Sequence, residues 1–432
     1  MGAATAFRNS TSSFHLLDGS GAFGTTDIGR AIIIAEAGTL SNLRVNVDLA
    51  AGASASWIFT VHVNAVASAL TCTIGGASDI TATNTADDVA VVAGDVVSMV
   101  VTKTGTPSVS TNYQHALDFE ATAANRAIWG GVNGTTPATG ATHYGQLGGT
   151  GQDDFANTVE ATAALLWSIN ATITSLYIKL FAAPGAGDTR AFTIMQNGLA
   201  VGDTVTIADL ATTGNATGMS IVIAPGDTLS LRNAETGTPA DSGVSYGIAY
   251  APTIDGQWNI SGKATADYTN GQFTIINLGI TGITSTELDA IVLGDAAGNA
   301  TKNWRIGNLR VSTGTSPSGS ETRTYTLKIS GASSTVSAVI TGVATTGSST
   351  TIERVNDGST LGLLLNKSAS AAGSTTQRWA FLAMPAGGIV SPPGGGGGPN
   401  RPPGGRPNPP GGGGSGLTGP VLKKLRFPEK VI

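Results

Sequence analysis

One sequence pattern occurs three times in this chain at a fixed interval. In each copy a loop leads into a segment that begins with an aromatic residue followed by threonine, at Phe59, Phe192 and Tyr325. These three residues are 133 positions apart each time. A period of this length lies far outside the roughly 20–50 residues of solenoid and propeller repeats. Each copy is therefore predicted to be a whole domain with its own core, which argues against one large enzyme fold.

Within each copy the apolar residues recur with a period of two. Segments 43–47, 176–180 and 309–311 alternate apolar and polar residues, as expected for strands with one buried face. Turn signals follow about every ten residues, and no copy contains an amphipathic helix with a cap. Copies of about 130 residues with this pattern are typical of antiparallel β-sandwiches, among which the jelly roll fits best.

The prediction is therefore an all-β protein made of three tandem antiparallel β-sandwich domains of the jelly-roll type, followed by a Gly/Pro-rich tail. Trp129 and Trp258 begin the second and third copies. On this basis the domains are expected at residues 1–123, 124–254 and 255–386.

A Gly-Asp pair recurs at Gly94-Asp95 and Gly226-Asp227, and it degrades to Asp357-Gly358 in the third copy. We expect each pair to form the turn of a β-hairpin, with glycine supplying a positive φ. A calcium site would need six to eight oxygen ligands, and one carboxylate per turn falls well short of that number.

No constellation of catalytic residues is evident. The four histidines are scattered without metal-ligand spacing, and no possible acid, base or nucleophile recurs in all three copies. Phosphate-binding and dinucleotide-binding glycine motifs are missing too. The sequence therefore predicts a protein that is not an enzyme and needs no cofactor or metal. The six tryptophans could serve as sugar platforms, but their place beside apolar strands favours core or domain-junction packing.

Cysteine content and hydropathy bear on where the protein is made. Cys72 is the single cysteine, which precludes an intrachain disulfide and favours a buried strand position. We expect no signal peptide at the N-terminus and find no apolar run approaching the ~20 residues of a membrane span. The expectation is a soluble protein that is synthesised in the cytoplasm.

The C-terminal region differs in composition from the rest of the chain. Residues 387–420 are mostly Gly and Pro without a Gly-X-Y period, so they are predicted to be a linker that buries no core. Residues 421–432 are basic and apolar, and we expect them to dock onto a partner. The residues expected to make this contact are Val421, Leu422, Lys423, Lys424, Leu425, Arg426 and Phe427. A free end without a partner, or contact with nucleic acid or membrane, are the weaker alternatives.

Charge separates the same two regions. Residues 386–432 hold six of the 23 basic and one of the 28 acidic residues, a net charge of +5, which leaves −10 on the rest. Charged residues make up only 12% of the chain, against about 25% in typical soluble domains. Such a neutral polar surface is expected of proteins that are packed against neighbouring copies in an assembly.

The tandem Gly/Ala/Thr-rich β-domains, the low charge and the turns at 93–98 and 225–230 resemble those of tailed-bacteriophage virion proteins, of the head-decoration and fibre type. The two turns also look like those in the jelly rolls of tumour-necrosis-factor-like domains. The virion resemblance implies a non-enzymatic component, synthesised in the host cytoplasm and located in the virion. It also implies that other virion proteins, of capsid or tail, are the partners of the C-terminal peptide, with a homo-oligomer as a further option. No nucleic-acid or membrane partner is expected. The alternative is a bacterial surface adhesin or glycan-binding module.

Overall fold

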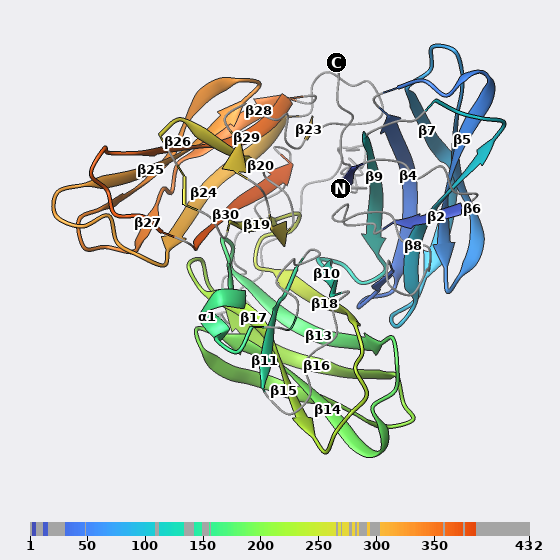
Figure 1. The fold of residues 1–432 in the computed structure, drawn as a ribbon, viewed down its shortest axis with the longest axis horizontal. Coiled ribbons are helices and arrows are strands. Elements are labelled where there is room, and N and C mark those ends of the chain that lie inside the picture. Colours follow the sequence, from blue (N-terminus) through green and yellow to red (C-terminus); the bar gives the residue numbers. More distant parts are fainter. Residues whose placement is uncertain are drawn as a thin grey trace, which may run out of the picture.

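The fold is described from a computed structural model, in which strands form three lobes around a common centre (Figure 1). Strands β1–β9 make up one lobe, here called domain 1, strands β10–β18 make up domain 2, and strands β19–β30 make up domain 3. The structure describes residues 2–5, 12–15, 31–47, 49–108, 112–133, 142–148, 155, 157–264, 267–268, 270–275, 279–280, 283–284, 292–293, 303–356, 359–374 and 376–385.

Domain 1 consists of two facing sheets. Sheet A contains, in spatial order, β1 (Gly2–Thr5), β9 (Asn112–Ala121), β4 (Gly38–Val47) and β7 (Thr81–Val91). Sheet B contains β2 (Ser12–His15), β8 (Val96–Thr104), β5 (Gly52–Val63) and β6 (Val66–Gly76), and the short β3 (Ile32–Ile33) pairs with β8.

Domain 2 repeats this arrangement. Sheet C contains β10 (Ala127–Asn133), β18 (Val244–Pro252), β13 (Ala171–Leu180) and β16 (Thr213–Ile223). Sheet D contains β11 (His143–Gln146), β17 (Thr228–Thr236), β14 (Gly185–Gln196) and β15 (Leu199–Asp209), and the short β12 (Leu165–Leu166) pairs with β17. A single helical turn, α1 (Glu160–Ala163), precedes β12.

Domain 3 has the same two sheets with additional short strands. Sheet E contains β21 (Gly279–Ile280), β19 (Trp258–Ala264), β30 (Gln377–Pro385), β24 (Asn303–Thr313) and β27 (Thr346–Ser348), with β28 (Ile352–Asn356) also on β24. Sheet F contains β22 (Ile283–Thr284), β20 (Gln272–Ile275), β29 (Ser359–Lys367), β25 (Thr322–Ile329) and β26 (Ala332–Thr341), with β23 (Val292–Leu293) on β29.

The strand order makes each domain a jelly roll. When the eight main strands are counted along the chain, one sheet has the order 1-8-3-6 and the other 2-7-4-5 in all three domains. The described strand pairs are antiparallel apart from a two-residue parallel pairing of β19 with β21. Successive strands therefore alternate between the two sheets, except that the fourth and fifth strands are neighbours in one sheet, as in a jelly roll. The predicted all-β class and β-sandwich architecture are confirmed.

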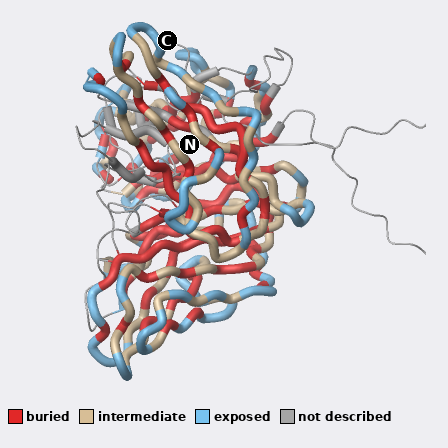
Figure 2. The backbone as a smooth tube through the Cα atoms, turned by 90° about the vertical axis from the view of Figure 1, so that its right-hand side faces the viewer, coloured by how far each residue is buried: buried red, intermediate tan, exposed pale blue. Residues whose placement is uncertain are grey.

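The repeated aromatic residues occupy one equivalent position in the three cores. Phe59, Phe192 and Tyr325 lie on the fourth strand of their domains and are fully buried. Their partners on the fifth strand are Cys72, Val205 and Ala338, which are again 133 residues apart. The alternating segments of the third strand also behave as predicted, because Leu43, Leu176 and Leu309 point into the cores. Figure 2 shows buried residues running along the strands and exposed ones gathered at the loops.

The Gly-Asp pairs do not form hairpins, which corrects the prediction. Gly94 and Gly226 do have positive φ, at 98° and 101°. However, the strands on either side of each pair lie in opposite sheets, since β7 pairs with β4 and β8 pairs with β5. Local sequence specifies the sharp turn, but the jelly-roll path decides that the chain crosses between sheets there. Asp357-Gly358 lies outside the described residues.

The tight hairpins lie instead between the fourth and fifth strands. Both central residues of the turn have positive φ in each domain, as a type I′ turn requires. These turns are Asn64-Ala65, Asn197-Gly198 and Ser330-Gly331. The dipeptide Asn197-Gly198 is a strong sequence signal for this turn. Ala65 in the first copy and Ser330 in the third replace one of the preferred residues, so the signal is weaker there.

The tryptophans have the structural roles that the sequence favours. Five of the six are buried in the cores: Trp57, Trp129, Trp167, Trp304 and Trp379. Trp258 is half-buried and packs against the cores of both domain 2 and domain 3, so it lies at their junction. Cys72 is buried in domain 1, as expected.

Candidate functional site

The contacts between domains are the most distinctive feature of the described molecule. Domain 1 meets domain 2 through the segment around β3, which lies on the outer face of sheet C over β10, β18 and β13. The Ser175 hydroxyl donates to the carbonyl of Ala35 at 2.9 Å, and the Ser245 hydroxyl donates to that of Ala31 at 2.6 Å. Both serines are buried, so these hydrogen bonds fix the segment onto the sheet.

Domain 2 meets domain 3 through the equivalent segment around β12. This segment lies on the outer face of sheet E, over β30, β19 and β24. The Asn308 amide donates to the carbonyl of Ser168, and Arg378 Nε donates to the carbonyl of Ala164 at 2.7 Å. Asn259 Oδ1 accepts from both the backbone N–H and the hydroxyl of Ser168, at 2.9 and 2.7 Å.

The two contacts follow the 133-residue period residue by residue. Ser175 and Asn308 are 133 positions apart, and so are the residues whose carbonyls they bind, Ala35 and Ser168. The same is true of Ser245 and Arg378 and of their acceptors, Ala31 and Ala164. The repeat therefore includes a head-to-tail contact, in addition to the fold of each domain.

The side chains that make the two contacts differ in length. At the first contact the serines are short and Gly247 has no side chain, so the β3 segment lies directly on the sheet; a Cβ on Gly247 would stand 2.2 Å from the Ile33 carbonyl oxygen. At the second contact the longer Arg378 and Lys263 extend to the end of α1. They donate to the carbonyls of Ala161 and Thr162, which a helix C-terminus leaves without an intrahelical partner.

The Gly-Asp turns hold these linking segments within their own domains. Ile34 N donates to the Asp95 carbonyl and Gly94 N to the Ile34 carbonyl, both at 2.8 Å. Domain 2 repeats this pair of bonds, because Trp167 N donates to the Asp227 carbonyl at 2.8 Å and Gly226 N to the Trp167 carbonyl at 2.7 Å. The recurrent turn therefore positions the segment that crosses to the next domain.

The carboxylates of these turns are used for turn structure. Asp95 accepts hydrogen bonds from Val92 N at 2.8 Å and from the Asn64 amide at 2.7 Å. Asp227 accepts from Ala224 N and the Asn197 amide, both at 2.8 Å. The asparagines come from the tight hairpins, so each hairpin is joined to a turn that neighbours it in space.

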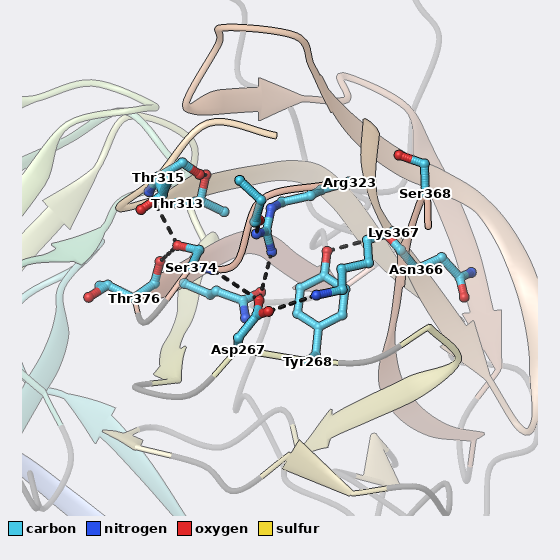
Figure 3. Close-up of polar contacts among 12 residues, drawn as sticks. Asp267, Tyr268, Thr313, Thr315, Arg323, Asn366, Lys367, Ser368, Ser374 and Thr376 are labelled. Atoms are coloured by element: carbon cyan, nitrogen blue, oxygen red, sulfur yellow. Dashed lines mark hydrogen bonds and ion pairs between the residues drawn. The ribbon is translucent and has the colours of Figure 1, made fainter. Parts of the chain in front are cut away.

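Domain 3 contains a compact cluster of charged groups around Asp267 (Figure 3). Its carboxylate accepts from Arg323 Nη1 at 3.1 Å, Lys367 Nζ at 2.7 Å and Ser374 N at 3.1 Å. Burial by itself raises the pKa of Asp267, but these hydrogen bonds outweigh it and hold the pKa below its ordinary value. Both cations also lie over the ring of Tyr268, at 5.3 and 5.8 Å from its centre.

This cluster has a counterpart of different chemistry in domain 2. Arg190, which is 133 positions before Arg323, is fully buried and binds the Glu235 carboxylate at 2.5 Å and the Ala240 carbonyl at 2.7 Å. Arg323 likewise donates to a carbonyl, that of Ala372. The corresponding residue of domain 1 is Trp57, which is buried in the core. In domains 2 and 3 the arginine therefore anchors a loop to the sheet through the carbonyl of Ala240 or Ala372, and its carboxylate partner comes from a different element in each of the two.

Within the described part of the chain, no three His, Cys, Asp or Glu side chains are grouped so as to hold a metal ion. The described helical residues include no segment with the length and hydropathy of a membrane span. Burial raises the pKa of the Cys72 thiol to about 12, with smaller opposing effects from Asn84 and Arg44. This thiol is therefore protonated near neutral pH and is a poor nucleophile.

The predicted docking residues, Val421 to Phe427, lie outside the described residues, as does the linker 387–420. The head-to-tail contacts were missed by reasoning from the sequence. The linking segments 31–35 and 164–168 are both largely apolar and lie at the same interval of 133 positions, which is the signal that could have revealed them. They share little residue identity, so the repeat is hard to recognise there. A scan against protein-family models and a search of curated proteins find no match to this chain.

Proposed function

We propose that this protein is a non-enzymatic structural component of a bacteriophage particle, a capsid decoration or a fibre, held to the particle by its C-terminal peptide. The observation that carries the proposal is the combination of three jelly rolls, linked by a repeated contact, with a Gly/Pro-rich tether that ends in a basic apolar peptide. Repetition of one module favours a role in display and attachment, because one module is reused to build a larger surface.

The use of polar groups in the described residues supports this proposal. The carboxylates of Asp95, Asp227 and Asp267 each accept several hydrogen bonds from neighbouring backbone and side-chain groups. Groups bound in this way stabilise turns and loops, whereas a general acid or base must be able to reach a substrate. These three carboxylates therefore have structural roles in the domains.

The tail supports attachment at a distance from the body. If extended at about 3.1 Å per residue, the part of the linker at 391–420 spans on the order of 90 Å. Burial of an apolar side chain such as Leu422, Leu425 or Phe427 contributes about 1–2 kcal/mol. Several of them must be buried together to offset the cost of ordering the peptide. Its positive charge would favour an acidic receiving surface on the particle.

Deletion of residues 417–432 tests the attachment. The shortened protein should remain folded, with an unchanged far-ultraviolet circular dichroism spectrum, but should no longer copurify with particles. Two full-length variants separate the contributions: one replaces Val421, Leu422, Leu425 and Phe427 by serine, and the other replaces Lys423, Lys424 and Arg426 by glutamine. The first should abolish incorporation and the second should weaken it in a salt-dependent manner. Normal occupancy of the deleted protein would contradict the proposal and place the contact on a domain.

A surface adhesin that binds glycans is the second candidate. It is less favoured because aromatic sugar platforms must be exposed, and five tryptophans are buried while Trp258 packs at a domain junction. Binding of the body, without its tail, to a defined glycan on an array would favour this alternative.

A further inference from the structure

Two arginines face each other on the outer surface of domain 3. Arg305 on β24 and Arg354 on β28 are directly opposite in the antiparallel register of sheet E (Figure 1). Their strand neighbours Trp304 and Val355 belong to the core of domain 3, so the two arginines point away from it. Arg305 is half-buried and Arg354 is exposed. The ion pairs and hydrogen bonds found among the described residues involve neither guanidinium group.

This pair is specific to the third copy of the repeat. The corresponding cross-strand pairs are Thr39 with Ala90 in domain 1 and Thr172 with Val222 in domain 2. Like charges that are directly opposite each other destabilise an antiparallel sheet, whereas threonine and valine suit a strand. Because the two charges break this local rule and have no partner in the described part of the chain, they indicate binding of an anionic group from outside it.

The arginine pair lies where the Gly/Pro-rich tail leaves the body. The last strand is β30, and its Met384 and Pro385 are opposite Arg305 and Trp304. Residue 386 therefore begins about one strand spacing, roughly 4.8 Å, from the strand that carries Arg305. Met384 itself packs into the core cluster of domain 2, so the arginine pair lies at the rim of the contact between domains 2 and 3.

Domain 3 also differs from the other domains in net charge. Residues 255–385 contain nine basic and eight acidic residues, a net charge of +1. Residues 1–123 contain four basic and ten acidic residues, and residues 124–254 contain four and nine, so their net charges are −6 and −5. Repulsion from these two domains disfavours an extended polyanion such as nucleic acid. It acts little on a partner that meets only the rim of domain 3, because charges more than about 10 Å away are largely screened.

The surroundings of the arginine pair favour a protein partner. Ile352 lies on the same face of β28 as Arg354, is 50% exposed and is opposite Gly307, which has no side chain to cover it. Guanidinium groups bind carboxylates in a planar two-point geometry. An acidic protein surface offers carboxylates to the arginines and apolar side chains to Ile352, whereas an isolated phosphate offers only an anion. The C-terminal peptide combines the same two features, since its basic residues are interspersed with Leu and Phe.

We propose that Arg305 and Arg354 bind carboxylates on an acidic protein surface, and that this surface belongs to the partner onto which the C-terminal peptide docks. The second half of this statement rests on the proposed function. The chain is held at two points, the end of the tail and its origin. Once the peptide is bound, the tether keeps the body near the surface, so binding by the arginine pair becomes an intramolecular step and a weak site is sufficient.

The test compares variants of the full-length protein for binding to beads coated with poly-L-glutamate. Arg305→Thr with Arg354→Val introduces the residues that domain 2 has at these positions. Lys179→Gln with Lys328→Gln is the control, because it removes the same charge from the outer faces of two other sheets. The arginine variant should bind roughly 3- to 30-fold more weakly, since it loses two surface ion pairs. The control should change by less than about twofold, and an equal loss in the control would overturn the site.

Three other results would overturn the proposal. Equal binding by the natural protein and the arginine variant would remove these residues from the contact. Retention on beads that carry duplex DNA, lost with the two arginines and kept in the lysine control, would assign the site to nucleic acid. A lower unfolding temperature of the arginine variant would show that the pair serves the fold, because removal of opposed like charges should leave this temperature equal or higher.

A measurement on particles separates this inference from the proposed function. The arginine variant should still incorporate through its tail, but it should dissociate roughly 3- to 30-fold faster after dilution. Dissociation at the natural rate, while deletion of residues 417–432 abolishes incorporation, would overturn this inference alone. Incorporation that does not depend on residues 417–432 would overturn the proposed function, and the result on poly-L-glutamate would still decide whether the arginine pair binds carboxylates.

Discussion

Gly247→Ala is expected to disturb the contact between domains 1 and 2 specifically. An added Cβ would lie 2.2 Å from the carbonyl oxygen of Ile33 and 3.3 Å from its carbonyl carbon, whereas ordinary contact begins near 3.4 Å. The β3 segment must therefore retreat by about 1 Å, since backbone on both sides leaves no flexible side chain to yield. A shift of that size weakens the hydrogen bonds from Ser175 and Ser245, at 2.9 and 2.6 Å.

The expected magnitude follows from these contacts. Two neutral hydrogen bonds contribute about 1 kcal/mol each, and overpacking costs about 1–3 kcal/mol where the structure cannot relax. If both hydrogen bonds are lost, the combined loss of about 3–5 kcal/mol corresponds to a roughly 150- to 4000-fold more favourable opening of the segment. Hydrogen–deuterium exchange measured on peptides that span 31–37 should show this acceleration, while peptides of domain 3 should not change.

Two comparisons make the reasoning refutable. Gly75→Ala is a matched control, because its added Cβ would meet Ser56 Cβ at 3.4 Å, an ordinary contact, so it should leave exchange at 31–37 unchanged. In a background of Ser175→Ala with Ser245→Ala, Gly247→Ala should cost less than in the natural chain, because the hydrogen bonds that it weakens are already gone. If Gly247→Ala behaves like Gly75→Ala, or if its cost is fully additive with the serine changes, the steric argument is wrong.

Three further outcomes are expected. The pKa of Asp267 is lowered in the folded state, so its carboxylate contributes stability that is present above the unfolded pKa of about 4 and is lost as pH falls through the folded pKa. Acid unfolding followed by circular dichroism should therefore show a shallower pH dependence for Asp267→Asn than for the natural protein. Tyr325→Phe should cost about 1–2 kcal/mol in urea denaturation, because the Tyr325 hydroxyl donates to the buried Gln377 side chain at 2.9 Å, and no loss would show that this bond contributes nothing. Cys72 should resist alkylation by iodoacetamide at pH 8 until the protein is unfolded, and rapid labelling of native protein, followed by mass spectrometry, would contradict its burial.

Several local features could be predicted because short-range physical chemistry governs them. Alternation at 43–47 identifies a strand with one buried face, and the interval between Phe59, Phe192 and Tyr325 identifies three equivalent cores. The positive φ at Gly94 also follows from the local turn. The hairpin assigned to that turn was wrong, because pairing partners depend on the path of the whole chain through two sheets.

The candidate site shows the same division. The sequence by itself determines an all-β chain with three copies of one unit and a Gly/Pro-rich linker that lacks core-forming residues. It does not reveal that Ser175 and Asn308 bind the preceding domain, because hydrogen bonds to backbone carbonyls place no demand on the identity of Ala35 or Ser168. Only the tertiary structure decided which sheet faces receive those segments, since docking depends on backbone position and on steric access at residues such as Gly247. Side-chain patterning specifies each sandwich, and the contacts made through the backbone specify how the sandwiches are joined.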